Sequence, residues 1–212
     1  RGAVLPLEPR GMAAPPPSRV AGLLLTGGAS RRMGTDKALI EVGGQLLVDR
    51  AAAVLSAVAS PVVEVGPGWS ALPAVREDPP GSGPLAALAA GAAELRRLGH
   101  DGPVLVLAVD MPRVTVELLR FLAERAGPPA TAVPRAGGHP QPMCARYGPD
   151  VLAAIDERLA TGGRSLRDLL ESLAVPGAVA WVEPEEWEPV AGPGAFADVD
   201  TPEDLRRFRE GR

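Results

Sequence analysis

The sequence contains little of what several classes of protein require. It has one cysteine, Cys144, among 212 residues, so no disulfide can form within the chain, and a reducing compartment is indicated. Aromatic residues make up only 3% of the chain, so its core has to be built from Leu, Val and Ala. No apolar run reaches the roughly 18 residues that cross a membrane. We therefore expect a cytoplasmic protein with no membrane partner.

The charge of the chain is also close to balance. It carries 22 Lys and Arg against 26 Asp and Glu, which gives a formal net charge of −4. Because there is no basic excess, we expect no nucleic-acid partner. Hydrophobic residues form 46% of the sequence, which is ample for one folded core at this length.

The first 19 residues differ in composition from the rest of the chain. They include Pro6, Pro9 and three consecutive prolines at 15–17. Proline at this density builds neither a helix nor a central strand, and the segment shows no secretory signal pattern. We predict a proline-rich leader, disordered or loosely docked, over residues 1–19 and a single domain over residues 20–212.

From Val20 onward, short apolar runs alternate with amphipathic stretches. Strands are predicted at residues 20–25, 61–65, 103–109, 130–134, 143–147 and 179–182. Helices are predicted at residues 46–59, 84–98, 114–126, 150–160 and 165–173, and after Thr201. This alternation predicts an α/β fold: a single doubly wound, mostly parallel sheet with helices on both faces. Ligands of such sheets bind at the carboxyl ends of the strands, where the strand order reverses.

The stretch after the first strand has the composition of an anion-binding loop. Gly27 and Gly28 allow a ligand to approach the main chain closely, and successive N–H groups can form an anion-binding concavity. Positive charge is added by Arg31, Arg32 and Lys37. A polyphosphate fits this chemistry, although a Gly-Gly pair alone is more often only a turn. Neither the Gly-Lys-Ser/Thr phosphate loop nor the Gly-x-Gly-x-x-Gly dinucleotide pattern is present.

The stretch from Leu25 to Lys37 reads Leu-Thr-Gly-Gly-Ala-Ser-Arg-Arg-Met-Gly-Thr-Asp-Lys. It resembles the signature of the MobA-type molybdenum cofactor guanylyltransferases, Leu-Ala-Gly-Gly-x-Ser-x-Arg-Met-Gly-x-Asp-Lys. Thr26 stands where that family usually has Ala. A related cytidylyltransferase branch usually has Ala-Gly in place of Gly-Gly, so the glycine pair here favours guanine.

The resemblance implies a Rossmann-like nucleotidyltransferase fold and assigns roles within this loop. Arg32 and Lys37 are expected to stabilise the leaving pyrophosphate during catalysis. The nucleotide is expected to contact Leu25, Thr26, Gly27, Gly28 and Lys37.

Asp110 follows the most apolar strand of the chain. A carboxylate at the lip of a sheet can hold a hard cation through oxygen. Aspartate in this position also often closes a turn or caps a helix. The resemblance includes an Asp-Met-Pro element here, and it implies that Asp110 is a catalytic residue that contacts the nucleotide and binds Mg²⁺, the cofactor we expect.

A Gly/Pro-rich loop at residues 76–85 runs into a predicted helix. Taken alone, it is as well explained as a helix-entry turn. The family has an Asp several residues before Gly-Pro-Leu that contacts guanine, and Asp78 matches it. Ala87 replaces the last glycine of the family's Gly-Pro-Leu-Ala-Gly. A close backbone approach at that position is therefore in question.

The stretch from Phe196 to Leu205 is similar to the family's Asn-x-Asn-Thr-Pro-Glu-Asp-Leu element, with Asp198 and Asp200 in place of both asparagines. The Thr-Pro-Glu-Asp part is also an ordinary helix start. Asp198 is expected either to supply a second metal ligand or to sense the incoming pterin phosphate. The resemblance further implies that loops at residues 137–147 and 162–166 close over the pterin.

The resemblance spans nearly all of residues 20–208. It implies an enzyme that transfers GMP from GTP to the phosphate of molybdopterin and releases pyrophosphate. GTP and molybdopterin are the expected substrates, and molybdopterin-synthesis proteins and recipient molybdoenzymes are candidate partners. Three alternatives stay open: a cytidylyltransferase that uses CTP, a guanylyltransferase for another phosphorylated acceptor, and a non-catalytic nucleotide or cofactor carrier. The presence of both Lys37 and Asp110 argues against a passive carrier.

Overall fold

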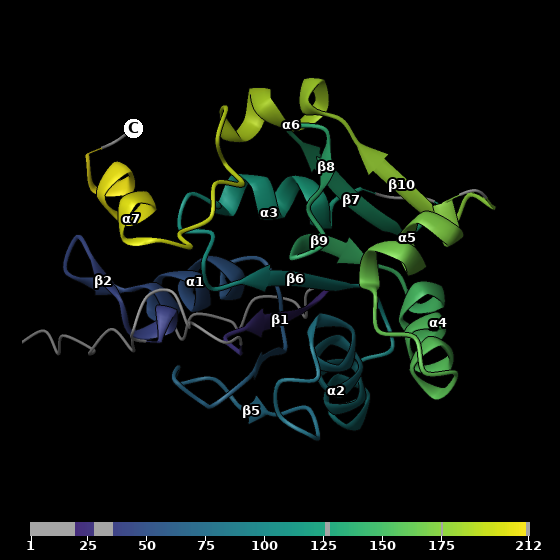
Figure 1. Ribbon diagram of the computed structural model, residues 1–212. Helices are drawn as coiled ribbons and strands as arrows, with labels where there is room; N and C mark the ends of the chain where they lie inside the picture. Colours follow the sequence, from purple (N-terminus) through teal and green to yellow (C-terminus); the bar gives the residue numbers. More distant parts are fainter. Residues whose placement is uncertain (1–19, 28–35, 126–127, 175, 211–212) are drawn as a thin grey trace, which may run out of the picture.

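A mixed β-sheet with helices on both faces forms the centre of the molecule (Figure 1). The computed structural model describes residues 20–27, 36–125, 128–174 and 176–210. The predicted leader at 1–19 and most of the glycine loop, at 28–35, lie outside these described residues.

The strands of the sheet lie in the order β10-β7-β9-β6-β1-β4-β5, with β8 paired to β7. Only β9 and β8 run antiparallel to their neighbours in these pairings. Their bounds are β1 Ala21–Leu25, β4 Val62–Val65, β5 Ala74–Val75, β6 Val104–Ala108, β7 Thr131–Ala136, β8 His139–Pro140, β9 Cys144–Tyr147 and β10 Val179–Val182. The α/β fold with a mostly parallel sheet is confirmed.

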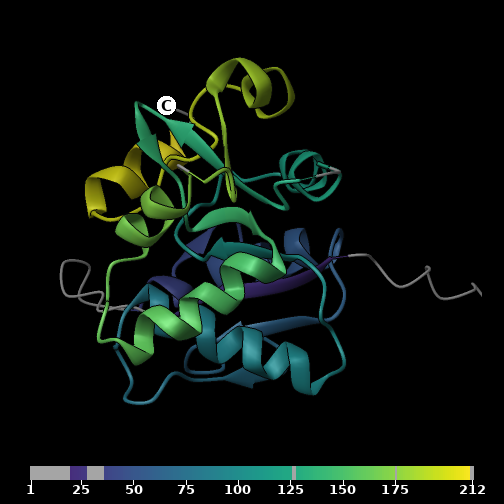
Figure 2. The same cartoon turned by 90° about the vertical axis from the view of Figure 1, so that its right-hand side faces the viewer.

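Two layers of helices cover the sheet, as the two views in Figures 1 and 2 show. One buried apolar cluster joins the sheet to α1, α3 and α6, and a second joins its other face to α2, α4 and α5. The helices are α1 Leu47–Ser56, α2 Pro84–Arg97, α3 Val116–Ala123, α4 Pro149–Ala160, α5 Leu166–Ala174, α6 Pro184–Ala191 and α7 Pro202–Arg209, with a short 3-10 helix η1 at Lys37–Leu39. This arrangement confirms the doubly wound architecture.

The chain reverses its direction of travel across the sheet at β1. It passes from β1 to β4 and β5 on one side, and then returns to place β6 on the other side of β1. Leu25, the last residue of β1, is in register with Val65 of β4 and with Ala108 of β6. The carboxyl ends of these strands therefore meet at the switch point, where doubly wound sheets bind their ligands.

Helix α2 approaches the sheet closely because Gly91 faces it. A Cβ atom at Gly91 would lie 2.7 Å from both δ-carbons of Leu23 and 2.8 Å from Cγ2 of Val65. Leu23 and Val65 are themselves buried. The glycine thus sets the distance between α2 and the strands that end at the switch point.

The carboxyl-terminal segment returns to the same edge of the sheet. The amide of Val199 donates to the carbonyl oxygen of Asp110 at 2.8 Å. Thr201 caps α7 in a reciprocal capping box with Asp204, which confirms the predicted helix start. Arg209 at the end of α7 donates to the carbonyl of Glu41, in the hairpin formed by β2 (Glu41–Val42) and β3 (Gln45–Leu46). None of the helices in the described ranges is long and apolar enough to cross a bilayer.

Candidate active site

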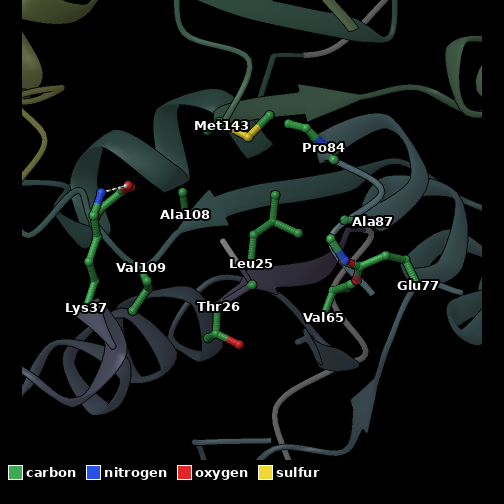
Figure 3. A pocket seen from close by; sticks show the side chains of 14 residues that line it. Leu25, Thr26, Lys37, Val65, Glu77, Pro84, Ala87, Ala108, Val109 and Met143 are labelled. Carbon is green, nitrogen blue, oxygen red and sulfur yellow. Dashed lines mark hydrogen bonds and ion pairs between the residues drawn. The ribbon is translucent and has the colours of Figure 1, made fainter. Parts of the chain in front are cut away.

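A cavity of about 410 Å³ opens at the switch point (Figure 3). Its walls come from the ends of β1, β4 and β6, from η1, and from the loop and first turn of α2. Its lining residues are Leu25, Thr26, Gly27, Lys37, Val65, Glu77, Gly81, Gly83, Pro84, Ala87, Ala108, Val109, Asp110 and Met143. Figure 3 shows Lys37 and Glu77 on opposite sides of the cavity, with Leu25 between them.

Lys37 and Asp110 meet on one side of this cavity. The Nζ atom of Lys37 lies 3.0 Å from Oδ2 of Asp110 and also pairs with the carboxylate of Asp200. Partial burial alone would lower the pKa of Lys37, but its hydrogen bonds and charge interactions with Asp200 and Asp110 raise the pKa above its ordinary value. Lys37 is therefore a fixed cation at the edge of the cavity.

The main chain around Asp110 is held from two sides. The carboxyl-terminal segment bonds to the carbonyl of Asp110 through Val199, as described above. On the other side, Nε of Arg50 in α1 donates to the carbonyl of Pro112 at 2.8 Å. No sequence motif pointed to Arg50, because its contact depends on how α1 packs against the sheet.

Asp198 lies beside this cluster and outside the cavity lining. Desolvation, followed by the nearby charges of Asp200 and Asp110, raises the pKa of its carboxyl. Negative charge therefore accumulates around Lys37. Among the described residues, no group of three or more His, Cys, Asp or Glu side chains is arranged to hold a metal ion by itself.

The loop before α2 brings Glu77 to the cavity. Glu77 is 8% exposed, and its Oε1 accepts from the amide of Gly81 at 2.8 Å, which closes the loop. Asp78, the predicted guanine contact, is exposed and is not part of the cavity lining. Ala87 does line the cavity, so its methyl group occupies space that a glycine would leave open.

The amino-terminal end of α2 also faces the cavity, through Gly83 and Pro84. The positive end of a helix dipole and its free N–H groups favour an anion at such a place. The amino-terminal end of α2 and the ammonium of Lys37 therefore give the cavity two sources of positive potential suited to phosphate groups.

Thr26 is fixed by a residue that the sequence analysis missed. Its hydroxyl donates to the buried carboxylate of Glu64 at 2.6 Å. An acidic residue within the apolar run of β4 is an unusual feature that could have drawn attention to Glu64. Of the predicted loop residues, the structure brings Leu25, Thr26, Gly27 and Lys37 to the cavity, whereas Gly28 and Arg32 lie outside the described residues.

The chain is similar to known proteins in both sequence and fold. Residues 22–189 match the family described as the MobA-like NTP transferase domain. The chain belongs to this family. A probable molybdenum cofactor guanylyltransferase from Pelotomaculum thermopropionicum is 34% identical over 90% of this chain and 92% of its own length. A protein of the same description from Chloroflexus aggregans is 33% identical over 88% of this chain and 92% of its own length.

The fold of this MobA-like protein is also found among solved structures. Molybdopterin-guanine dinucleotide biosynthesis protein A from Archaeoglobus fulgidus superposes with a TM-score of 0.72, covering 90% of this chain and 97% of that chain at 24% identity. The family match makes the protein a nucleotidyltransferase, and the superposition shows the Rossmann-like fold expected from its sequence. The family match ends at residue 189, so Asp198 and Asp200 lie beyond it although they adjoin the cavity residues Lys37 and Asp110.

Proposed function

We propose that this nucleotidyltransferase transfers GMP from GTP to the phosphate of molybdopterin and releases pyrophosphate. The observation that carries the proposal is the pairing of Lys37 with Asp110 at the mouth of one cavity, where β1 and β6 end. A cation for the leaving group and an acid for a metal ion are what transfer of a nucleotidyl group requires. The descriptions of the relatives support guanine as the base and the molybdenum cofactor as the acceptor.

In the proposed reaction, an oxygen of the pterin phosphate attacks the α-phosphorus of GTP in line with the leaving group. The bond between the α-phosphorus and the oxygen that bridges to the β-phosphate breaks, and its electron pair leaves with pyrophosphate. Lys37 neutralises charge on that pyrophosphate, and Arg32 is proposed to do the same. No covalent enzyme intermediate is needed, so catalysis consists of positioning and electrostatic stabilisation.

The nucleotide is proposed to lie along the ends of β1 and β6. Its triphosphate follows Leu25, Thr26 and Gly27 and continues onto Gly28, with the positive end of α2 nearby. The base is proposed to lie on the side of Glu77, with Asp78 as the carboxylate that accepts from the N1–H and N2 groups of guanine. Because Asp78 is exposed and outside the cavity lining, this assignment requires the 77–81 loop to adjust around the base.

Asp110 and Asp198 are the residues proposed to hold Mg²⁺. The crowding of carboxylates around Lys37 fits a hard cation, and Mg²⁺ commonly takes one or two carboxylates and fills its remaining positions with water and substrate phosphates. When bound, the ion supplies neutralisation of charge on the phosphate oxygens. Asp110 and Asp198 would fix the place of that charge, beside the ammonium of Lys37, which pairs with Asp200 in the structure.

The acceptor is proposed to bind beyond β6, on the side of β9. Met143, from the stretch that resembles the family's pterin region, already lines the cavity there. The loops at 137–147 and 162–166 are proposed to cover the pterin. Proteins that make molybdopterin and molybdoenzymes that receive the product are the protein partners we propose.

Pyrophosphate release in the presence of Mg²⁺ and molybdopterin tests the proposal, with GTP, CTP and ATP compared side by side. Release with GTP alone is expected. Asp110→Asn is expected to reduce the rate by on the order of 100-fold or more, whereas Glu188→Gln, which removes an exposed carboxylate on α6, leaves it unchanged. Release with CTP alone would instead support the cytidylyltransferase, and GTP binding without release in any mixture would support the carrier.

A further inference from the structure

Glu64 is a buried carboxylate surrounded by hydrogen-bond donors. It lies in β4 with 0% of its surface exposed, next to Leu24 of β1 in the sheet register. Five donors reach its two oxygens, and all five are neutral groups. A buried charge is costly unless its hydrogen bonds are satisfied, so this set of bonds has to form for the carboxylate to remain ionised.

Four of the donors come from the loop that follows β4, at residues 66–72. Oε1 accepts from the amides of Gly68 and Trp69 at 2.9 and 2.8 Å. Oε2 accepts from the amide and hydroxyl of Ser70 at 2.7 and 2.6 Å. Successive amides that converge on one anion form a nest, here filled by a side chain of the protein itself.

The fifth donor is Thr26, which lines the cavity. Its hydroxyl donates to Oε1 of Glu64 at 2.6 Å, so a single carboxylate joins the 66–72 loop to the end of β1. The two segments also touch directly at Gly66. A Cβ atom there would lie 2.1 Å from Oγ1 of Thr26 and 2.9 Å from the amide nitrogen of Gly27.

We propose that Glu64 is a positioning residue for the nucleotide site: its carboxylate fastens the 66–72 loop to Thr26 and so fixes the backbone of Thr26 and Gly27 on which the triphosphate lies. This inference rests on the proposed binding of a nucleoside triphosphate in the cavity. Glu64 has no exposed surface and does not line the cavity, so it acts through Thr26 without touching the ligand.

The role is carried by the carboxylate and not by the size of the side chain. Both oxygens of Glu64 only accept, and backbone amides point at each of them. In Glu64→Gln, the NH2 group would face at least one of these amides, donor against donor. We call the hydrogen-bonded group of Glu64, Thr26 and residues 66–72 the clasp. In this variant, at least one hydrogen bond between residue 64 and the backbone amides of the 66–72 loop is therefore expected to be lost.

Nucleotide affinity, measured by direct titration of the full chain with Mg²⁺ and GTP, tests the clasp. Glu64→Gln is expected to weaken binding by about 5- to 30-fold. Ser70→Ala removes the bond that the Ser70 hydroxyl donates to Glu64 and the bond that it accepts from the amide of Leu72, and Ser70 does not line the cavity. This variant is expected to weaken binding by a smaller factor. The matched control is Thr131→Val, which removes another buried hydrogen bond, to the amide of Gly148, far along the sheet at β7.

Three results decide between positioning and a purely structural role. The clasp predicts weaker binding in both Glu64→Gln and Ser70→Ala, with Thr131→Val destabilised but unchanged in affinity. It is overturned if Glu64→Gln and Ser70→Ala melt at lower temperature while binding GTP as the wild type does. If Glu64→Gln does not fold, Ser70→Ala decides alone, because loss of the two hydrogen bonds of the Ser70 hydroxyl, to Glu64 and from the amide of Leu72, still loosens the loop.

Non-additivity gives a second test, because Thr26 and Ser70 are joined only through Glu64 in the hydrogen bonds described. In a double-mutant cycle of Thr26→Val and Ser70→Ala, the clasp predicts a combined loss of affinity that differs from the product of the two single losses. Strict additivity would contradict it.

The titrations are run with GTP, CTP and ATP, since the triphosphate is common to all three. Preference for another base would overturn the guanine assignment and leave the clasp in place.

Discussion

The ammonium of Lys37 lies 3.0 Å from the carboxylate of Asp110, although the two residues are 73 positions apart in the chain. This contact joins η1, which follows the glycine loop, to the end of β6, a strand that is buried at every position. Asp200 pairs with the same ammonium from the carboxyl-terminal segment. Three parts of the chain thus converge on one cation beside the cavity.

Asp200 is predicted to compete with the nucleotide for Lys37. Asp200→Asn, which restores the residue type of the family motif, keeps a hydrogen-bond acceptor but removes a negative charge. With that charge gone, the affinity for GTP is expected to rise by about fivefold, equivalent to ~1 kcal/mol. Isothermal titration of the variant against wild type and Glu188→Gln measures this effect. An affinity below that of the wild type would show that Asp200 supports nucleotide binding instead.

Glu64 is predicted to make stability depend on pH in the acid range. Burial by itself would raise its pKa, but hydrogen bonds from Ser70, Thr26 and Trp69 hold the pKa below the ordinary value of 4.5. The unfolded chain therefore binds a proton more readily than the folded one, so the stabilisation by Glu64 is present above pH ~4.5 and is lost as pH falls through the folded-state pKa.

The difference in unfolding free energy between wild type and Glu64→Gln is thus expected to shrink as the pH falls from ~4.5 through the folded-state pKa. Urea titrations at several pH values across this range measure it. A difference that stays constant across the range would mean that the carboxylate of Glu64 does not titrate with unfolding.

Gly91 is predicted to tolerate no branched side chain. Gly91→Val would press its side chain against Leu23 and Val65, both buried, and is expected to destabilise the fold by about 1–3 kcal/mol. Ala93→Val places the same side chain at an exposed position of the same helix and serves as the control. Chemical denaturation of the two variants separates overpacking from the helix propensity of valine; equal losses would contradict close packing at Gly91.

Cys144 is predicted to be inert in the folded protein. It lies in β9 with 0% exposure, and burial raises the pKa of its thiol to about 12. A thiol reagent is therefore expected to label it only as fast as the protein unfolds, because the thiolate is the reactive form. Labelling followed in buffer and in denaturant checks this. Rapid stoichiometric labelling in buffer would place the thiol within reach of solvent.

Much of the fold could be predicted from the sequence because its strands are continuous apolar runs. The runs that became β1, β4 and β6 are buried on both faces, which is the pattern of a parallel core. Helix α6 was not predicted, and it contains Pro184 and Pro189, a residue type that often breaks a helix. Pro184 instead occupies the first turn, where proline is tolerated, and Glu183 with Glu186 forms a capping box.

The site could be predicted only in part. A ligand site was expected at the carboxyl ends of the strands, and Lys37 and Asp110 do lie together where β1 and β6 end. The contribution of Glu77 and Glu64 depends on loop paths and cross-strand register, which no single stretch of sequence encodes. The role of Asp78 stays a prediction, since its side chain is exposed beside the cavity loop.

The most direct test of nucleotidyl transfer follows the phosphorus atoms. The protein is incubated with molybdopterin, Mg²⁺ and GTP labelled either at the α- or at the γ-phosphate, and the products are separated. The α-label is expected in the pterin product and the γ-label in pyrophosphate, both lost in Asp110→Asn. A γ-label on the acceptor, or an α-label that never leaves the free nucleotide pool, would contradict transfer of GMP by this protein.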